Sequence, residues 1–275
     1  MVLNGTPASG GPADAVVRFV DRVRELAGRS ERADVCSENN FPTASGLASS
    51  ASGFAALAGA TTAALGLRLS DRALSQLARF GSGSAARSIF GGFVEWRAGH
   101  RSDGSDCYAR PLYPPGYWPA LVDLVVLVRD APVKEERSAD AMQRTVATSP
   151  AYPARLAEVP GRLERMRRAI GARDSDRLFP LVMEECDSFR EVCETTRPSL
   201  DYLTSASRAV LGEVRTINRD AGRPIAAYTH DAGAHVHVFT LQAELGRVRR
   251  RLGRFPGVER TQTLTPGPGL RRIGP

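Results

Sequence analysis

Residues 37–54 read SENNFPTASGLASSASGF, a polar loop that leads into a helix of small residues. The chain turns through Ser45-Gly46 and then enters an alanine-rich segment that ends near Leu65. The first N–H groups of a helix have no partner within the helix, and the helix dipole adds partial positive charge there. Because glycine, alanine and serine occupy the first turn, an anion can reach those donors. The stretch therefore predicts a phosphate site at a helix N-terminus.

This stretch differs from the GxxxxGK[ST] loop, because no lysine follows Gly46. By composition alone, a helix of Ala, Gly and Ser packed against a sheet is the more common explanation. The literal order of the residues changes this balance. Residues 39–51, NNFPTASGLASSA, closely resemble the ATP-phosphate motif of the diphosphomevalonate decarboxylases. These enzymes belong to the GHMP kinase superfamily, whose shared core is only P-x-x-x-G-L-x-S-S-A.

The resemblance implies that the loop and the helix start hold ATP with Mg²⁺. It makes Ser50 a catalytic residue, since phosphoryl transfer depends on alignment and charge neutralisation. The implied nucleotide-binding residues are Pro42, Ala44, Ser45, Gly46, Leu47, Ala48, Ser49 and Ser50.

A second cluster, residues 81–92, reads GSGSAARSIFGG. Arg87 follows Ser84 by one helical turn, which is typical of an anion-binding turn with a guanidinium on the same face. Ser/Gly turns beside an exposed arginine are also common without any ligand. The family carries the same string at a similar interval after its phosphate motif. The resemblance implies that Ser82 and Ser84 contact the substrate's diphosphate and that Arg87 holds its carboxylate. Ser138, which begins a helical segment that also matches the family, is implied to bind substrate.

A third cluster, residues 228–238, reads YTHDAGAHVHV and is expected to form a strand, a turn and a strand. His235 and His237 would face the same side of a strand, but no glutamate or cysteine completes a zinc site, so no metal ligand is predicted. An aspartate that stabilises its own turn is the structural alternative. The family carries Asp-Ala-Gly-Pro-Asn here, and the resemblance implies that Asp231 is the catalytic acid/base. Ala234 and His235 replace the family's proline and asparagine.

The resemblance implies one reaction for these three clusters. In the family, ATP phosphorylates the tertiary 3-hydroxyl of mevalonate 5-diphosphate, and loss of phosphate and CO₂ then gives isopentenyl diphosphate for isoprenoid biosynthesis. A tertiary alcohol is a poor nucleophile, so an aspartate within hydrogen-bond reach helps to deprotonate it. Arg87 would hold the leaving carboxylate through two hydrogen bonds. A cytoplasmic homodimer is implied as well.

Composition supports a globular protein without a membrane segment or a nucleic-acid face. The 275 residues can hold two modest domains, and 42% of them are hydrophobic. No apolar run approaches about eighteen residues, and no signal segment begins the chain. The net charge is +7, but the arginines are scattered and only Lys134 is a lysine, so the pattern does not favour nucleic acid. The cysteines lack metal-binding spacing and are expected to be reduced.

The expected fold class is α+β, with the two lobes of the GHMP kinases. The resemblance implies an N-terminal lobe like domain 2 of ribosomal protein S5 over residues 1–118 and a ferredoxin-like lobe over residues 119–260. Residues 261–275 contain three prolines and are expected to form a loose tail. Apolar periodicity predicts strands at 33–37, 121–128, 225–228 and 235–240, and helices at 14–27, 152–171, 175–195, 198–220 and 241–252.

The family's Lys-Tyr-Trp-Gly-Lys-Arg motif has no counterpart here, and Lys134 cannot replace its lysines. The sequence is therefore expected to be truncated at its N-terminus and to have little activity as it stands. Alternative functions are a phosphomevalonate decarboxylase, a mevalonate 3-kinase or an inactive ATP-binding homologue. A basic nucleic-acid-binding module is a further alternative from another class.

Overall fold

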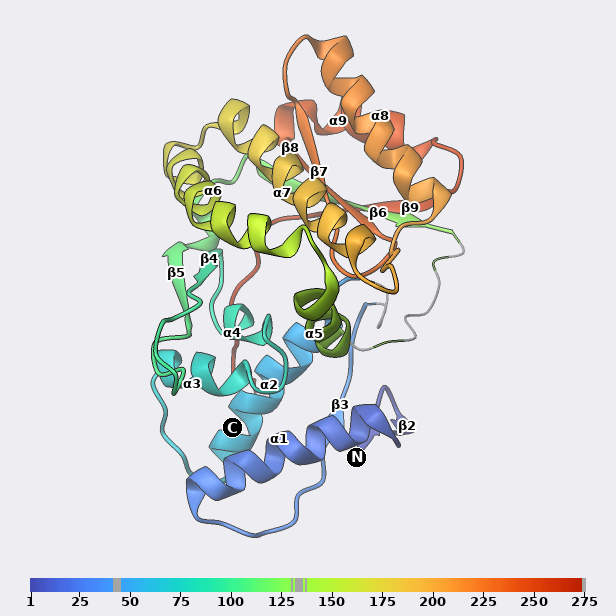
Figure 1. The fold of residues 1–275 in the computed structure, drawn as a ribbon. Helices are drawn as coiled ribbons and strands as arrows, with labels where there is room; N and C mark the ends of the chain where they lie inside the picture. The colour runs from blue at the N-terminus through green and yellow to red at the C-terminus, as the bar shows by residue number, and fades with distance from the viewer. Residues whose placement is uncertain (42–45, 130, 132–135, 137, 274–275) are drawn as a thin grey trace. The chain divides into compact units, whose positions relative to one another are not determined.

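The structure is a computed structural model that describes residues 1–41, 46–129, 131, 136 and 138–273 (Figure 1). The chain forms two compact units. The first comprises Met1–Thr43, Ala48–Tyr117 and Pro266–Pro275, and the second comprises Ala44–Leu47 and Trp118–Thr265. The chain leaves the first unit after Tyr117 and returns to it at Pro266. Both units combine helices with sheets, so the predicted α+β class is confirmed.

The first unit packs its helices around a modest core to which α2 contributes small residues. Its helices are α1 (Gly11–Ala27), α2 (Ser49–Ala64), α3 (Asp71–Ala78) and α4 (Ala85–Ser88). Short strands β1 (Val2–Leu3), β2 (Thr6–Pro7) and β3 (Cys36–Ser37) form one sheet, and β4 (Phe93–Trp96) pairs with β5 (Ala109–Tyr113). Phe19 and Val23 of α1 meet Ala55 and Ala58 of α2 in the core. The small side chains of α2 allow its neighbours to approach closely.

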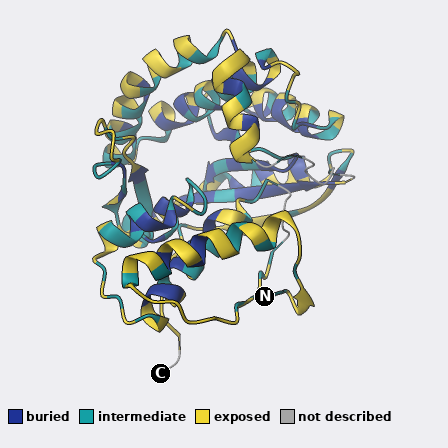
Figure 2. Ribbon diagram, turned by 60° about the horizontal axis from the view of Figure 1, so that its bottom comes forward, coloured by how far each residue is buried: buried dark blue, intermediate teal, exposed yellow. Residues whose placement is uncertain are grey.

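The second unit is built on an antiparallel four-stranded sheet in the order β7-β8-β6-β9. Its strands are β6 (Leu121–Val128), β7 (Ala226–Thr229), β8 (Val236–Leu241) and β9 (Val258–Leu264). Strand β6 is buried apart from Asp123, as its run of leucine and valine predicts. In Figure 2 the strands of this sheet are largely buried, whereas the helices show exposed residues along one side.

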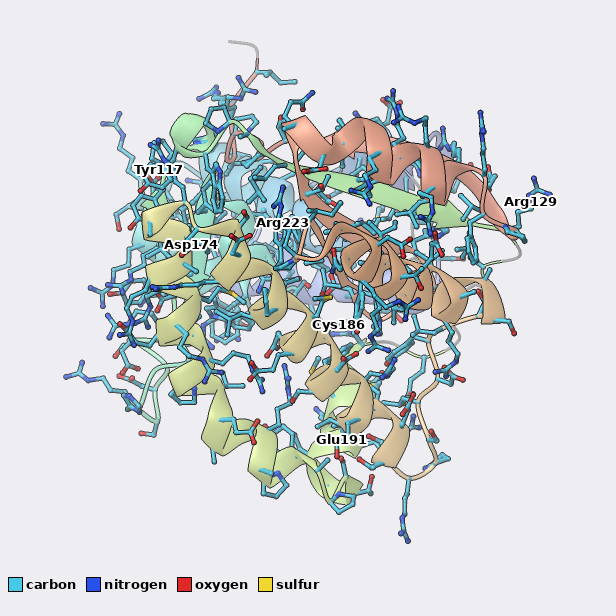
Figure 3. All side chains as sticks on the ribbon, turned by 90° about the horizontal axis from the view of Figure 1, so that it is seen from above. Tyr117, Arg129, Asp174, Cys186, Glu191 and Arg223 are labelled. Carbon is cyan, nitrogen blue, oxygen red and sulfur yellow. The ribbon has the colours of Figure 1, made fainter. Side chains whose placement is uncertain are left out.

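Three helices supply the apolar partners of this sheet. Helices α8 (Ser205–Ala221) and α9 (Gln242–Gly253) bury Val210, Leu211, Val214, Ile217, Leu245, Val248 and Leu252 in one cluster with the strands. Helix α7 (Ser175–Thr195) adds Cys186, and Figure 3 labels Asp174, Cys186 and Glu191 in order along it. Asp174 caps α7 by accepting a hydrogen bond from the Arg177 N–H at 3.0 Å.

Two helices continue through prolines, and one begins later than predicted. Pro160 lies inside α6 (Tyr152–Ala172) and Pro180 inside α7, although each interrupts the amphipathic pattern. Helix α5 (Ser138–Thr148) precedes them. The helix predicted from residue 198 begins at Ser205, because Thr204 and Ser207 form a reciprocal capping box there.

Among the described residues, none of the helices has the length and apolarity needed to cross a bilayer.

The expectation of a loose tail over residues 261–275 is wrong for its first residues. Residues 261–264 belong to β9, which pairs with β6. Farther on, the Gly92 N–H donates to the Gly267 carbonyl at 3.0 Å, and the Leu270 N–H donates to the Ile89 carbonyl at 3.1 Å. The strand has the sequence VERTQTL, and most of it is exposed at the edge of the sheet. An exposed edge strand needs no apolar alternation, which is why periodicity did not predict it.

A buried arginine joins α6 to α7. Arg162 is 3% exposed and binds Glu184 at 3.0 Å, Glu185 at 2.7 Å and Glu158 at 2.9 Å. Its Nε and both terminal nitrogens thus each donate to a carboxylate. Removing it would leave several carboxylates facing each other across the helix pair.

Replacing Arg162 by alanine is expected to lower the free energy of unfolding by about 2 kcal/mol, the scale of hydrogen bonds to charged groups. Arg165 is the matched control, since it binds the same Glu184 at 2.9 Å but its side chain is 53% exposed. Arg165→Ala should cost less than about 1 kcal/mol. Urea denaturation of both variants measures the difference, and equal losses would contradict the role given to Arg162.

Candidate active site

The first predicted cluster lies at the start of α2, where the structure describes it from Gly46 onward. Helix α2 begins at Ser49, and the preceding Ala48 has a left-handed backbone with φ of 52°. Ala48 provides no side-chain cap, and the first turn contains no acidic residue. This helix start is therefore open to an anion in both shape and charge. Pro42, Ala44 and Ser45 lie outside the described residues.

Serine hydroxyls connect the first cluster with the second. The Ser50 Oγ lies 3.1 Å from the Ser82 Oγ, which in turn lies 3.3 Å from the Ser84 Oγ. Ser50 precedes Ser82 by 32 positions, whereas Ser82 and Ser84 belong to the same segment. The structure thus brings together the hydroxyls predicted to bind nucleotide and those predicted to bind substrate.

Arg87 lies one turn beyond these serines. Its backbone N–H donates to the Ser84 carbonyl at 3.1 Å, and its side chain is exposed. With Ser52 and Ser88 it lines an open hollow of about 510 Å³ in the first unit. Within the described part of the chain, no carboxylate forms an ion pair with Arg87. Its guanidinium therefore keeps its hydrogen-bonding capacity for an anionic ligand.

The third cluster forms the turn between β7 and β8 in the second unit. Asp231 is exposed in this turn, and its backbone carbonyl accepts hydrogen bonds from the Gly233 N–H at 2.8 Å and from His230 Nδ1 at 2.7 Å. At the other end of the turn, the Ser207 hydroxyl donates to the Ala234 carbonyl at 2.6 Å. The turn that carries Asp231 is thus fixed at both ends by buried side chains.

Gly46 and Leu47 belong to the second unit, where Gly46 lies directly against the Asp231 turn. Gly46 has φ of 91°, and a Cβ added to it would lie 2.8 Å from the Gly233 Cα. Two backbones can approach this closely only when neither carries a side chain there. One residue of the predicted phosphate loop therefore meets the predicted acid/base turn. Ser138, the remaining predicted substrate residue, begins α5 and is exposed.

The three histidines of this segment have different partners. His235 precedes β8, is buried, and its Nδ1 accepts a hydrogen bond from the Val128 N–H at 3.3 Å. His237 lies within β8, and its Nδ1 is 2.7 Å from the Asp123 Oδ2. His230 Nδ1 binds the Asp231 carbonyl instead. Nowhere in the described ranges do three or more His, Cys, Asp or Glu side chains form a group that could hold a metal.

These partners set the proton affinity of each ring. Burial lowers the pKa of His235 and likewise that of His230. Burial also disfavours a charged His237, but the hydrogen bond and the negative charge of Asp123, with a smaller contribution from Asp231, outweigh it and raise the pKa of His237. His237 is therefore easier to protonate than an isolated histidine, chiefly because of its contact with the Asp123 carboxylate.

The Asp123–His237 pair was not predicted from the sequence. A signal was present, because Asp123 interrupts an otherwise apolar strand. A charged residue in such a strand indicates a partner on the neighbouring strand. The partner could not be identified without the register, which places Asp123 opposite Phe239 and leaves His237 on the diagonal.

Family models of diphosphomevalonate decarboxylase domains match both the N-terminal and the C-terminal part of the chain. Residues 1–109 match a family model described as the diphosphomevalonate decarboxylase-like N-terminal domain. Residues 124–268 match one described as the mevalonate 5-diphosphate decarboxylase C-terminal domain. The chain is similar to the diphosphomevalonate decarboxylase of Aspergillus fumigatus, with 39% identity over 89% of this chain and 63% of the relative. It is also similar to the Candida albicans enzyme, with 41% identity over 87% of this chain and 67% of the relative. The chain thus spans about two thirds or less of the length of these curated relatives.

Solved structures give the same result. The mevalonate diphosphate decarboxylase from Enterococcus faecalis, whose structure concerns mevalonate diphosphate mediated ATP binding, aligns with a TM-score of 0.87 and 36% identity. This alignment covers 98% of the present chain and 80% of that one. A structure of MDDEF in complex with MVAPP, AMPPCP and magnesium aligns with a TM-score of 0.89, 37% identity and the same coverage. The Trypanosoma brucei enzyme aligns with a TM-score of 0.87 and 32% identity, and the alignment covers 99% of the present chain and 82% of that one.

Replacing Gly46 by alanine is expected to lower the free energy of unfolding by about 1–3 kcal/mol, because it strains a left-handed backbone and pushes against Gly233. Gly53 in α2 is the matched control, since a Cβ there would meet nothing within 4 Å. Gly53→Ala should instead stabilise the helix by about 0.5–1 kcal/mol. Urea denaturation measures both. A neutral Gly46→Ala variant would show that the approach to Gly233 is not tight.

His237→Asn tests the charge of His237, because the asparagine amide can replace the Nδ1 donor without a positive charge. Because the pKa of His237 is raised in the folded state, protonation of His237 stabilises the fold. This stabilisation is complete below the ordinary value of 6.5 and is lost as pH rises through the folded-state pKa. The loss of unfolding free energy caused by His237→Asn should therefore be larger at about pH 6 than at about pH 9.

His235→Asn is the control for this pH dependence and should show the opposite sign. The lowered pKa of His235 gives stability that is present above 6.5 and lost as pH falls through the folded-state pKa. Urea titrations of both variants at the two pH values provide the comparison. Parallel pH profiles for the two variants would contradict a raised pKa of His237 and a lowered pKa of His235.

Proposed function

The chain belongs to the diphosphomevalonate decarboxylase family, and from that membership we propose that it acts in the ATP-dependent decarboxylation of mevalonate 5-diphosphate to isopentenyl diphosphate. The relatives named above are decarboxylases of the diphosphate, which favours this substrate over phosphomevalonate and favours decarboxylation over simple 3-kinase activity. The observation that carries the proposal is the Ser50–Ser82–Ser84 chain of hydroxyls, which joins the predicted nucleotide and substrate residues.

The start of α2 fits the phosphates of a nucleotide. It lacks a side-chain cap and an acidic residue, and its first turn offers small side chains and the hydroxyls of Ser49 and Ser50. ATP would supply the phosphoryl group, and Mg²⁺ would neutralise its charge. The residues proposed to hold the nucleotide are Pro42, Ala44, Ser45, Gly46, Leu47, Ala48, Ser49 and Ser50.

Ser82, Ser84, Arg87 and Ser138 are proposed to hold the substrate. Hydroxyls suit a diphosphate because each can donate to a phosphate oxygen. The exposed Arg87 guanidinium would bind the carboxylate through two parallel hydrogen bonds and fix its orientation relative to the bond that breaks. Lysine could not reproduce this geometry, since an ammonium is a point charge.

Asp231 is proposed to take the proton of the 3-hydroxyl. The carboxylate is exposed, and the backbone that carries it is held by His230, by Ser207 and by the close approach of Gly46. A fixed base reduces the cost of aligning a poor nucleophile. We further propose that the protein acts in the cytoplasm as a homodimer and serves isoprenoid biosynthesis.

Asp231→Asn provides the test. Asparagine keeps the size and shape of the side chain but cannot accept the proton, so kcat should fall by at least about 10²-fold while KM for both substrates changes little. Asp176→Asn, at an exposed carboxylate on α7, is the control and should keep parental kinetics. ADP formation and radiolabelled CO₂ release are the measurements.

Two outcomes would contradict the proposal. The first is release of CO₂ by Asp231→Asn at the parental rate, which would remove Asp231 from the chemistry. The second is a folded parental protein that forms neither ADP nor CO₂ with mevalonate 5-diphosphate and MgATP, which would reject the activity for this chain.

A further inference from the structure

His230 holds the backbone of the residue that follows it. Its Nδ1 lies 2.7 Å from the Asp231 carbonyl oxygen. A carbonyl can only accept a hydrogen bond, so Nδ1 carries the proton and donates it. The same oxygen accepts the Gly233 N–H at 2.8 Å. Two donors on one carbonyl fix the orientation of the peptide plane that follows Asp231.

The other nitrogen of the ring faces the protein interior. The ring is 4% exposed, and its Nε2 is buried without a hydrogen-bond partner among the described residues. The Phe189 ring on α7 lies 5.7 Å away, centroid to centroid. A proton on Nε2 would be a buried donor without an acceptor, which is costly. The surroundings therefore permit one form of His230, the neutral ring protonated on Nδ1.

Burial of the ring also favours the neutral form. Burial makes the largest contribution to the lowered pKa of His230, and Arg190 of α7 and Arg208 of α8 lower it further. The hydrogen bond to the Asp231 carbonyl and the Asp231 charge act against these effects but are smaller than burial. The neutral donor form is thus favoured by burial of the ring as well as by its hydrogen-bond geometry.

We propose that His230 is a positioning residue for Asp231, and that its Nδ1–H, by fixing the Asp231 carbonyl, sets the direction in which the Asp231 carboxylate leaves the backbone. The proposal rests on the proposed function, in which Asp231 takes the proton of the substrate hydroxyl. A base that is displaced by about 1 Å loses about 10²-fold in rate, so the constraint matters for turnover. Ser207 holds the far end of the turn at the Ala234 carbonyl, and Gly46 lies against Gly233. His230 is the side chain that holds the Asp231 carbonyl itself.

Three substitutions separate the donor from the bulk of the ring. His230→Asn places an amide nitrogen near the position of Nδ1 and can keep the hydrogen bond. His230→Gln places its amide near the position of Nε2 and cannot. His230→Leu fills the space without any donor. A purely structural ring would be replaced best by leucine, whereas a positioning donor would be replaced best by asparagine.

Two measurements on the full chain do not depend on activity. The ¹⁵N spectrum of the imidazole should show a neutral His230 protonated on Nδ1. Amide hydrogen exchange of Gly233 should be faster in His230→Gln and His230→Leu than in the parent, and close to the parental rate in His230→Asn. An Nε2–H tautomer, or Gly233 exchange that is the same in all variants, would overturn the proposal.

Kinetics provide the third measurement. His230→Gln and His230→Leu should lower kcat by about 10²-fold with little change in KM, and His230→Asn should recover most of that loss. Equal kcat values for the asparagine and leucine variants would overturn the positioning role. A parental protein without turnover would reject the proposed function alone, since the tautomer and the Gly233 exchange still decide whether His230 fixes the turn. Thermal unfolding of each variant excludes global destabilisation as the cause.

Discussion

Burial of β6 is the constraint on which the second unit depends. A strand buried on both faces must pair its backbone donors and acceptors on both edges, since unpaired buried groups are costly. Strand β8 satisfies one edge and β9 the other. The pairing of Leu124 with Val238 and Val126 with Val236 then places the beginning of β8, and with it the Asp231 turn, at one end of the sheet. The position of the proposed base thus follows from the hydrogen-bonding needs of an apolar strand.

Much of the fold could be predicted because local and tertiary preferences agree there. The leucine and valine run of β6 and the Ala/Gly/Ser start of α2 both formed the expected elements. Prediction failed where tertiary contacts override the local pattern. Strand β9 is stabilised by its pairing with β6 and not by its own composition. The capping box at Thr204 also shortened a helix that periodicity alone had extended.

The site itself could be predicted only in part. The motifs identify Ser50, Ser82 and Ser84 as functional candidates, but their hydroxyl contacts depend on the packing of α2 against the segment before α4. The histidines near Asp231 show the limit more clearly. Their spacing predicted only that His235 and His237 share one side of a strand, whereas the structure gives each ring a different partner: a carbonyl, a backbone N–H and a carboxylate. Spacing defines which side chains share a face of a strand, but the neighbouring elements define their protonation.

The return of residues 266–273 to the first unit determines how the chain would respond to mechanical load. Both ends of the described chain belong to that unit, and residues 44–47 and 118–265, which belong to the second unit, lie between its segments. A force applied between Val2 and Leu270 would act first on the first unit, including the hydrogen bonds that join Gly92 to Gly267 and Ile89 to Leu270. The inserted sheet would lie outside the path of the force until those bonds had broken. Residues 118–265, which carry Asp231, are therefore shielded from tension by the connectivity of the backbone, whereas Gly46 and Leu47 of the same unit remain on the loaded part of the chain.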